Sequence, residues 1–367
     1  MKYFLSSNCA LIQNKLFCVE AYCGLLVMIN SDDGKVDCCD TSEGFISKKT
    51  RVVDFIESFD GKIYALDSSG DYLVIFDLSK CKCQYIWLGC AKDAKVNFSA
   101  FERCESYYYI FPKYGNKIMF FDIEKSKVTT GNYFNGIQEV QCACRIDNNV
   151  WILPKDAEKM YCYHLPDMEV DTYELGVVLK NCVHAVYCNG YIYILEKFGA
   201  IHKWNIEKAL LQTITILEAK HDEQESMSRI VYARNKLIVL PGYAGDIKIL
   251  NLLTKEAEIY NDYPEDFFYY GTNWLKYYGY CEDEEFFYFA MCAGNYMLMI
   301  KRETGELIWR KPVLDKLGEK VVRLLNNSGE NLFHEGSLEI ADLFGAERID
   351  FTSGHEGDIG KAIYEKV

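Results

Sequence analysis

The sequence predicts an all-β protein built from seven copies of one four-stranded antiparallel unit. Apolar runs recur every 42 to 49 residues, a polar residue follows each run at a nearly constant distance, and an alternating stretch precedes several of them. The chain of 367 residues also has 28 tyrosines and only six prolines, which favours sheet over helix.

The recurrent apolar run is the first element to place, because such a short apolar stretch is typical of a buried strand. Its copies are NKLFCVE, GKIYALD, SYYYIFP, NNVWILP, GYIYILE, NKLIVLP and EEFFYFA, whose third residues are Leu16, Ile63, Tyr108, Val150, Ile192, Leu237 and Phe286. We expect each run to form the second strand of its unit.

A polar landmark follows each run, at Asn30, Asp77, Asp122, His164, Asn205, Asn251 and Lys301. Asp and Asn close tight turns there, because their side chains bond the backbone two residues further on. Stretches such as VVDFIES, EVQCACRI and SRIVYAR precede the runs and alternate as first strands do. Four short strands, repeated seven times, predict a seven-bladed β-propeller.

In these runs and their spacing, residues 1–314 resemble the broad β-propeller superfamily of kelch, WD40 and quinoprotein-like repeats. The Gly-His and Trp-Asp pairs of WD40 and the double glycine of kelch are missing, and ETGELIW (303–309) alone matches the quinoprotein repeat. The resemblance implies a ring of sheets around a channel, and no particular activity.

The expected blades span about 1–47, 48–92, 93–134, 135–176, 177–218, 219–270 and 271–314. Residues 315–367 break the repeat and contain LDKLGEKVVRLLNN, SLEIADLF and DIGKAIYEKV, which predict short amphipathic helices. This extension either packs against one end of the ring or docks a partner.

Composition excludes several classes of function. A net charge of −14 disfavours general nucleic-acid binding and association with anionic membranes. The start has no apolar core of signal-peptide length, and no stretch of about 18 apolar residues follows.

The 16 cysteines fall within apolar runs, so we expect reduced, buried thiols in the cytoplasm. CKC (81–83) and CAC (142–144) lack the second pair of a zinc site, and we expect no metal and no cofactor.

The loops after the second strands are the first candidate site, because in this architecture they share a face with the connections between blades. One aligned column holds lysines and the next holds aromatic residues. Lysines at equivalent places would form a local positive patch for an anionic group, and flat rings alongside suit a sugar or a peptide side chain. The alternative is that the rings cap the blade core. The candidate residues are Tyr22, Lys113, Tyr114, Lys155, Lys197, Phe198 and Tyr243.

The stretch YPEDFFYYGTNW (263–274) joins the sixth unit to the seventh and follows neither a two-residue nor a 3.6-residue pattern. Its rings either fold over the channel mouth as a lid or pack sideways on the neighbouring blade. We expect a partly exposed wall, with Trp274 turning into the core. The wall residues are Tyr263, Phe267, Phe268 and Tyr270.

The innermost strands suggest what lines the channel. The residues nine positions before the third residue of each apolar run are mostly polar, as a hydrated channel requires. Two further candidates each lie one residue after such a position. The channel-lining candidates are Asp54, Ser99, Gln141, His184, Ser228, Arg229 and Tyr277. In a catalytic interpretation Asp54 acts as a base, His184 as an acid and Arg229 as an anion clamp. The preferred interpretation is a hydrated structural channel.

Two functions stay open. The preferred one is a non-enzymatic binding or scaffold protein that holds a protein, peptide or glycan partner on the loop face of the propeller. The alternative is an enzyme, acting as a hydrolase, lyase or group transferase at the channel mouth on an anionic or sugar-containing substrate. No motif supplies the close acid–base pair that such chemistry needs, so no catalytic residue is assigned.

Overall fold

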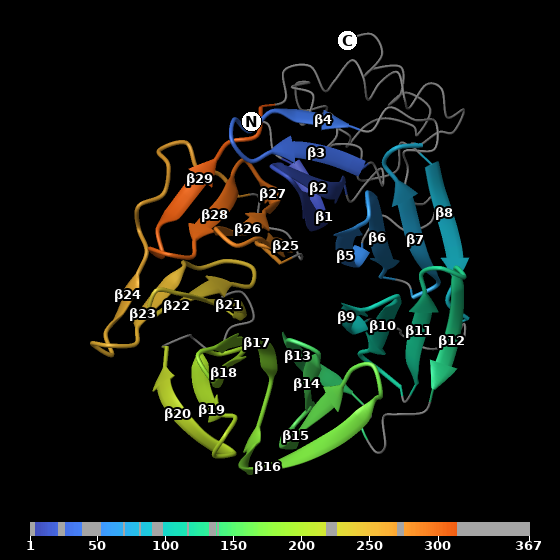
Figure 1. The fold of residues 1–367 in the computed structure, drawn as a ribbon. Coiled ribbons are helices and arrows are strands. Elements are labelled where there is room, and N and C mark those ends of the chain that lie inside the picture. The colour runs from blue at the N-terminus through green and yellow to red at the C-terminus, as the bar shows by residue number, and fades with distance from the viewer. Residues whose placement is uncertain are drawn as a thin grey trace, which may run out of the picture.

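The computed structural model describes residues 4–313 except 21–25, 39–52, 69, 81, 90–97, 116, 132–136, 138, 218–225 and 270–274. These residues form seven antiparallel sheets, each with four strands from one repeat, arranged around a common axis (Figure 1). The predicted seven-bladed β-propeller is confirmed. The helices expected within 315–367 lie outside the described residues.

Each blade runs from an innermost first strand to an outermost fourth strand (Figure 1). Blades 1 to 3 comprise β1 (Phe4–Ile12), β2 (Lys15–Glu20), β3 (Leu26–Asn30), β4 (Val36–Cys38); β5 (Val53–Phe59), β6 (Lys62–Asp67), β7 (Tyr72–Asp77), β8 (Lys82–Trp87); and β9 (Phe98–Cys104), β10 (Tyr107–Pro112), β11 (Ile118–Asp122), β12 (Lys127–Gly131). Blades 4 and 5 comprise β13 (Val140–Ile146), β14 (Asn149–Pro154), β15 (Ala157–His164), β16 (Glu169–Leu179); and β17 (Cys182–Cys188), β18 (Tyr191–Glu196), β19 (Ala200–Asn205), β20 (Leu210–Ile216). Blades 6 and 7 comprise β21 (Met227–Ala233), β22 (Lys236–Pro241), β23 (Lys248–Asn251), β24 (Ala257–Ile259); and β25 (Gly279–Glu282), β26 (Phe286–Ala290), β28 (Met297–Lys301), β29 (Leu307–Arg310).

The expected blade intervals each enclose the four strands of one sheet, except that β16 continues to Leu179, past the expected boundary at 176. The core lies between blades rather than within them. One cluster of buried side chains, for example, joins Trp151 of blade 4 to Ile194 and Trp204 of blade 5. Each sheet therefore buries both faces, which explains why the second strands read as continuous apolar runs.

Each polar landmark is the last residue of the third strand of its blade, from Asn30 in β3 to Lys301 in β28. The Asn30 side chain accepts a hydrogen bond from the Asp32 amide at 2.8 Å, and Asn251 accepts one from Leu253 at 2.9 Å. The predicted turn chemistry is therefore observed, and it depends on local contacts alone.

A β-bulge interrupts the first strand of blades 1 to 6 at one equivalent place. In blade 2, Val53 pairs with Asp67 and Phe55 with Leu66, so Asp54 is the extra residue. Ser99, Gln141, Val183 and Ser228 are the extra residues in blades 3 to 6. Bulges re-aim side chains at sheet edges, so this row sets what the inner end of each blade presents.

Contacts between blades 7 and 1 close the ring at its inner strands and at its outer edge. The short strand β27 (Cys292–Gly294) pairs with β1, where Leu5 lies opposite Cys292. At the outer edge, the Val313 amide donates to the Gly34 carbonyl at 2.7 Å, and the Val36 amide donates to the Val313 carbonyl at 3.1 Å. The Asn8 side chain accepts from the Tyr280 amide at 2.9 Å and donates to the Asp54 carbonyl at 2.7 Å, which joins blade 7 to blade 2 across blade 1.

Candidate functional site

The loop face is the end of the ring where second strands finish and the chain enters the next blade. Hydrogen bonds link neighbouring blades there: the Val140 amide donates to the Lys113 carbonyl at 2.8 Å, and the Met227 amide to the Lys197 carbonyl at 2.7 Å. The lysine column thus shares one face with the blade connections, as expected for this architecture. The opposite end, which carries the turns from first to second strand, is called the turn face.

Two blades present the same lysine–aromatic pair on the loop face. The Lys113 Nζ lies 5.6 Å from the ring centroid of Tyr114, and the Lys197 Nζ lies 5.8 Å from that of Phe198. All four side chains are partly exposed. The third lysine differs, because the Lys155 Nζ pairs with the Glu139 carboxylate at 3.0 Å.

The remaining residues of these two columns contribute less to the face. Tyr243 is partly exposed at the equivalent place in blade 6, and Tyr22 lies outside the described residues. Because Lys155 pairs with Glu139, the lysine–aromatic arrangement is seen in blades 3 and 5 rather than in three adjacent blades.

The aromatic stretch from 263 packs sideways on blade 7. The rings of Tyr263 and Phe267 lie 5.5 Å and 5.1 Å from that of Trp309 in β29, and the Tyr263 hydroxyl accepts from the Ile247 amide at 3.3 Å. Phe268 is held through its backbone by the Asn295 side chain at 2.8 Å. Tyr270 and Trp274 lie outside the described residues, and the lid alternative has no support among the others.

Sequence reasoning missed a buried lysine that these rings enclose. The Lys276 Nζ lies within 6 Å of four ring centroids, at 5.2 to 5.9 Å, and donates to the Gly245 carbonyl at 3.3 Å. Burial lowers the pKa of Lys276. Its position directly after the aromatic stretch is the one sequence signal that could have indicated it.

Asp54 is the best connected of the channel candidates. Its carboxylate accepts from the Phe98 amide at 3.4 Å and from the Tyr278 hydroxyl at 3.5 Å, so it contacts blades 3 and 7. Burial raises the pKa of Asp54 to about 6, and the neighbouring Asp67 carboxylate adds to the shift. A carboxyl group that titrates near neutrality at the centre of the ring is suited to proton transfer.

Three other candidates have structural partners. The Ser99 hydroxyl donates to the carbonyls of Phe111 and Pro112, both at 3.2 Å, and Ser228 makes the equivalent bonds in blade 6. These serines satisfy carbonyls at the bulges. The Gln141 amide donates to Glu139 at 3.1 Å.

Tyr277 does not line the channel, which corrects the prediction. It is fully buried in the core between blades 6 and 7, and Tyr278 occupies the position equivalent to Asp54. The error follows from the landmark of the last unit, because Phe287, not Phe286, pairs as Leu16 and Ile63 do. Counting nine residues back from Phe287 gives Tyr278.

His184 and Arg229 occupy equivalent places, directly after the bulges of blades 5 and 6. The His184 Nδ1 accepts from the Ile230 amide at 3.5 Å, which leaves Nε2 as the protonated nitrogen. Burial, reinforced by the Arg229 charge, lowers the pKa of His184 to about 3. The Arg229 guanidinium lies 4.6 Å from the ring centroid of Tyr280. Both side chains are partly exposed although they lie on innermost strands.

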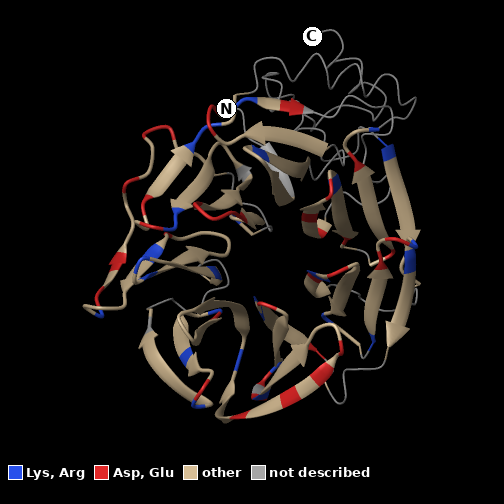
Figure 2. Cartoon of the chain, in the orientation of Figure 1, with Lys and Arg blue, Asp and Glu red and all other residues tan. Residues whose placement is uncertain are grey.

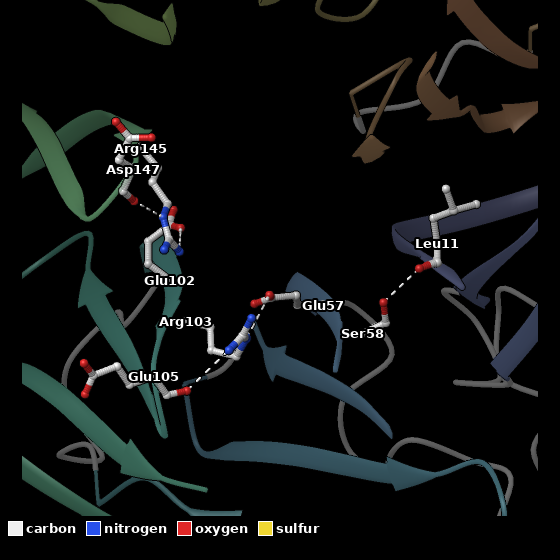
Figure 3. Close-up of polar contacts among 8 residues, drawn as sticks. All are labelled: Leu11, Glu57, Ser58, Glu102, Arg103, Glu105, Arg145 and Asp147. Carbon is white, nitrogen blue, oxygen red and sulfur yellow. Dashed lines mark hydrogen bonds and ion pairs between the residues drawn. The ribbon is translucent and has the colours of Figure 1, made fainter. Parts of the chain in front are cut away.

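Nearer the turn face, ion pairs join consecutive blades (Figure 3). The Arg103 Nε lies 3.9 Å from Glu57, and the Arg145 Nη1 lies 3.1 Å from Glu102. In each pair an arginine meets the carboxylate of the preceding blade. Burial raises the pKa of Glu57 to about 7. Figure 2 also shows acidic residues along β16, on the outside of the ring.

Comparison with known proteins identifies the fold alone. No protein-family model matches the chain, and no curated protein matches its sequence. The chain is similar in structure to virginiamycin B lyase of Staphylococcus aureus, solved as a catalytically inactive histidine-to-alanine variant with quinupristin, with a TM-score of 0.60 and 14% identity over 80% of this chain and 94% of that one. A streptogramin B lyase gives a TM-score of 0.59 and 9% identity over 84% and 95%.

A third similar structure is PorZ, a surface component of the type-IX secretion system of Porphyromonas gingivalis. It gives a TM-score of 0.56 and 12% identity over 85% of this chain. This chain spans 38% of the length of PorZ. The similar folds therefore include enzymes and a secretion component. Among the described residues no helix has the length and apolarity to cross a membrane, and no cluster of His, Cys, Asp or Glu is suited to a metal ion.

Proposed function

We propose that this protein is a binding module that holds an anionic peptide or glycan segment on the loop face of its propeller. The observation that carries the proposal is the repeated lysine–aromatic pair, Lys113 with Tyr114 and Lys197 with Phe198, on one face of blades 3 and 5. An ammonium group beside a flat ring suits a ligand that places a carboxylate or sulfate on the lysine and a side chain or sugar ring on the aromatic.

The test measures binding of a fluorescein-labelled octaglutamate peptide and a fluorescein-labelled heparin oligosaccharide by fluorescence polarisation at low ionic strength. Lys113→Ala with Lys197→Ala is compared with Lys127→Ala with Lys208→Ala. The control lysines are exposed and lie in the same two blades, but on the turn face.

Two exposed ionic contacts contribute about 0.2–1 kcal/mol each, so the loop-face pair of substitutions should weaken binding about two- to thirtyfold. The control pair should leave it unchanged. Peptide and glycan arms distinguish the two kinds of partner. Equal loss in both double variants would reject the loop face as the binding surface.

A second function, catalysis at the centre of the ring, is supported by one observation: the Asp54 carboxyl with its raised pKa lies beside the Tyr278 hydroxyl. Structurally similar proteins include lyases, so quinupristin is a reasonable first substrate. Mass spectrometry would detect turnover by the wild type and its loss in Asp54→Asn. An unchanged substrate with the wild type would exclude this activity on this compound.

The thiols support a reducing compartment, and we place the protein in the cytoplasm. Eleven cysteines in the described part of the chain form no disulfide, and eight of these are buried. Expression as a tagged protein, followed by fractionation, tests the location.

A further inference from the structure

Three arginines lie on the inner strands, and their partners differ. Arg103 and Arg145 each meet a carboxylate of the preceding blade and a backbone carbonyl, at 3.3 Å for Glu105 and 2.7 Å for Asp147. The Arg229 guanidinium has no hydrogen bond and no ion pair with any residue that the structure describes. The guanidinium instead makes a cation–π contact with the ring of Tyr280.

The nearby carboxylate and phenol groups do not compensate the charge of Arg229. The Glu282 carboxylate already accepts from the Tyr280 hydroxyl at 2.9 Å and pairs with Arg302 at 3.0 Å. Burial raises the pKa of Tyr278 and of Tyr280, which keeps both phenols neutral.

Two further neighbours complete the surroundings. His184 is neutral and adds an N–H donor rather than a negative charge. The Cys9 thiol, 3.6 Å from the Cys281 sulfur, is the remaining described group whose ionisation would act on Arg229. Burial of Cys9 opposes a thiolate, but hydrogen bonds with the Cys18 and Cys281 thiols and the Arg229 charge lower the pKa of Cys9. A Cys9 thiolate is therefore the internal alternative to an anion from solution, and the test below distinguishes the two.

An enclosed arginine remains charged, because its guanidinium does not deprotonate in proteins. Leaving such a charge unpaired is strongly unfavourable, so an anion from solution that pairs with Arg229 would gain a favourable interaction. Arg229 can receive one, since its side chain keeps solvent-exposed surface. The total charge of Arg229 and neutral His184 is one positive unit, which matches a monoanionic carboxylate better than a dianionic phosphate.

We propose that the inner wall of blades 5 and 6 is a binding site for a small carboxylate, held by the Arg229 guanidinium and the His184 Nε2–H. The guanidinium presents a fork of N–H donors that matches the two carboxylate oxygens. This site is separate from the lysine–aromatic pairs of the loop face, and it predicts a small ligand independently of the larger partner proposed there.

The test uses sodium acetate and sodium phosphate as probes at pH 7.5 and constant ionic strength. Melting temperature and isothermal titration calorimetry are measured for the wild type, Arg229→Met and Lys203→Gln. Lys203 is the matched control, because its ammonium also lies over a tyrosine ring, 3.6 Å from the centroid of Tyr191, but in β19 rather than on an innermost strand.

Acetate should raise the melting temperature of the wild type and of Lys203→Gln in a saturable way. Arg229→Met should bind at least tenfold more weakly and, without acetate, should melt no lower than the wild type, because the substitution removes an unpaired charge. His184→Phe, which keeps Arg229, should bind several-fold more weakly. If Arg229→Met does not fold, Arg229→Lys takes its place and should also bind more weakly, since it keeps the charge but not the fork.

An equal response of the wild type and Arg229→Met would overturn the site. Saturable binding of phosphate alone would overturn its assignment to carboxylates. Thiolate absorbance at 240 nm that disappears in both Cys9→Ser and Arg229→Met would show Cys9 to be the internal counter-ion, and would also overturn the proposal.

Discussion

Gly34 is the residue at which closure of the ring can be tested most directly. It lies in the turn between β3 and β4 with φ of +73°, and a Cβ there would overlap the Lys311 backbone carbonyl oxygen. The left-handed conformation alone does not require glycine, because Ala209 has φ of +47° and Lys255 has φ of +67° in the corresponding turns of blades 5 and 6. The close approach of Lys311 does.

The expected cost of Gly34→Ala has two parts. A left-handed alanine costs about 1–2 kcal/mol. Moving the Lys311 segment away also threatens the two hydrogen bonds between Gly34, Val36 and Val313, at about 0.5–1.5 kcal/mol each. The second part, about 1–3 kcal/mol, measures the outer contact between blades 1 and 7.

Gly305→Ala is the matched control. Gly305 has φ of +70° in the equivalent turn of blade 7, and its nearest heavy atom would be the Lys236 Cδ at 3.4 Å, an ordinary contact. Urea unfolding followed by circular dichroism gives both changes in stability, provided that the m-value is unchanged. Hydrogen exchange at the Val313 amide should accelerate in Gly34→Ala alone. Losses within about 0.5 kcal/mol of each other, with equal exchange, would refute the role of this contact.

Two further changes test the centre of the ring. Asn8→Ala removes two side-chain hydrogen bonds between blades and should cost about 1–3 kcal/mol in urea unfolding, whereas Asn14→Ala, which loses one exposed bond to Asp32, should cost little; equal costs would contradict the closure role of Asn8. Because the pKa of Asp54 is raised to about 6 on folding, its stabilising contribution is complete below pH 4 and is lost as the pH rises through 6. Asp54→Asn should therefore remove about 2–3 kcal/mol of the fall in stability of the wild type between pH 4 and 7, measured by urea midpoints across that range; an unchanged pH dependence would show that Asp54 titrates normally.

The local features of the fold were readable from the sequence. The Asn30 and Asn251 turns form through hydrogen bonds to residues two positions away, so they need no partner element. The buried second strands are apolar on both faces wherever they occur in the chain. Repetition of these two signals at one spacing was enough to predict seven blades.

The candidate site was only partly readable. The lysine–aromatic columns follow directly from the repeat, and the structure places them on one face. Whether a lysine is paired depends on a residue of another element, as Lys155 and Glu139 show. Tyr278 was missed because the run EEFFYFA was aligned on Phe286, whereas Phe287 is the residue that pairs as Ile63 does, which shifted the count by one residue.

By itself, the sequence determined the number of blades, the order of strands and the turns that join them, because these depend on periodicity and on contacts within a few residues. The tertiary structure decided which charges meet. Glu57 reaches Arg103, Gly34 reaches Lys311 and Asn8 reaches Tyr280 only after the blades have closed into a ring. Arg229 has no such partner among the described residues, and that difference arises from packing between blades, which no repeat in the sequence encodes.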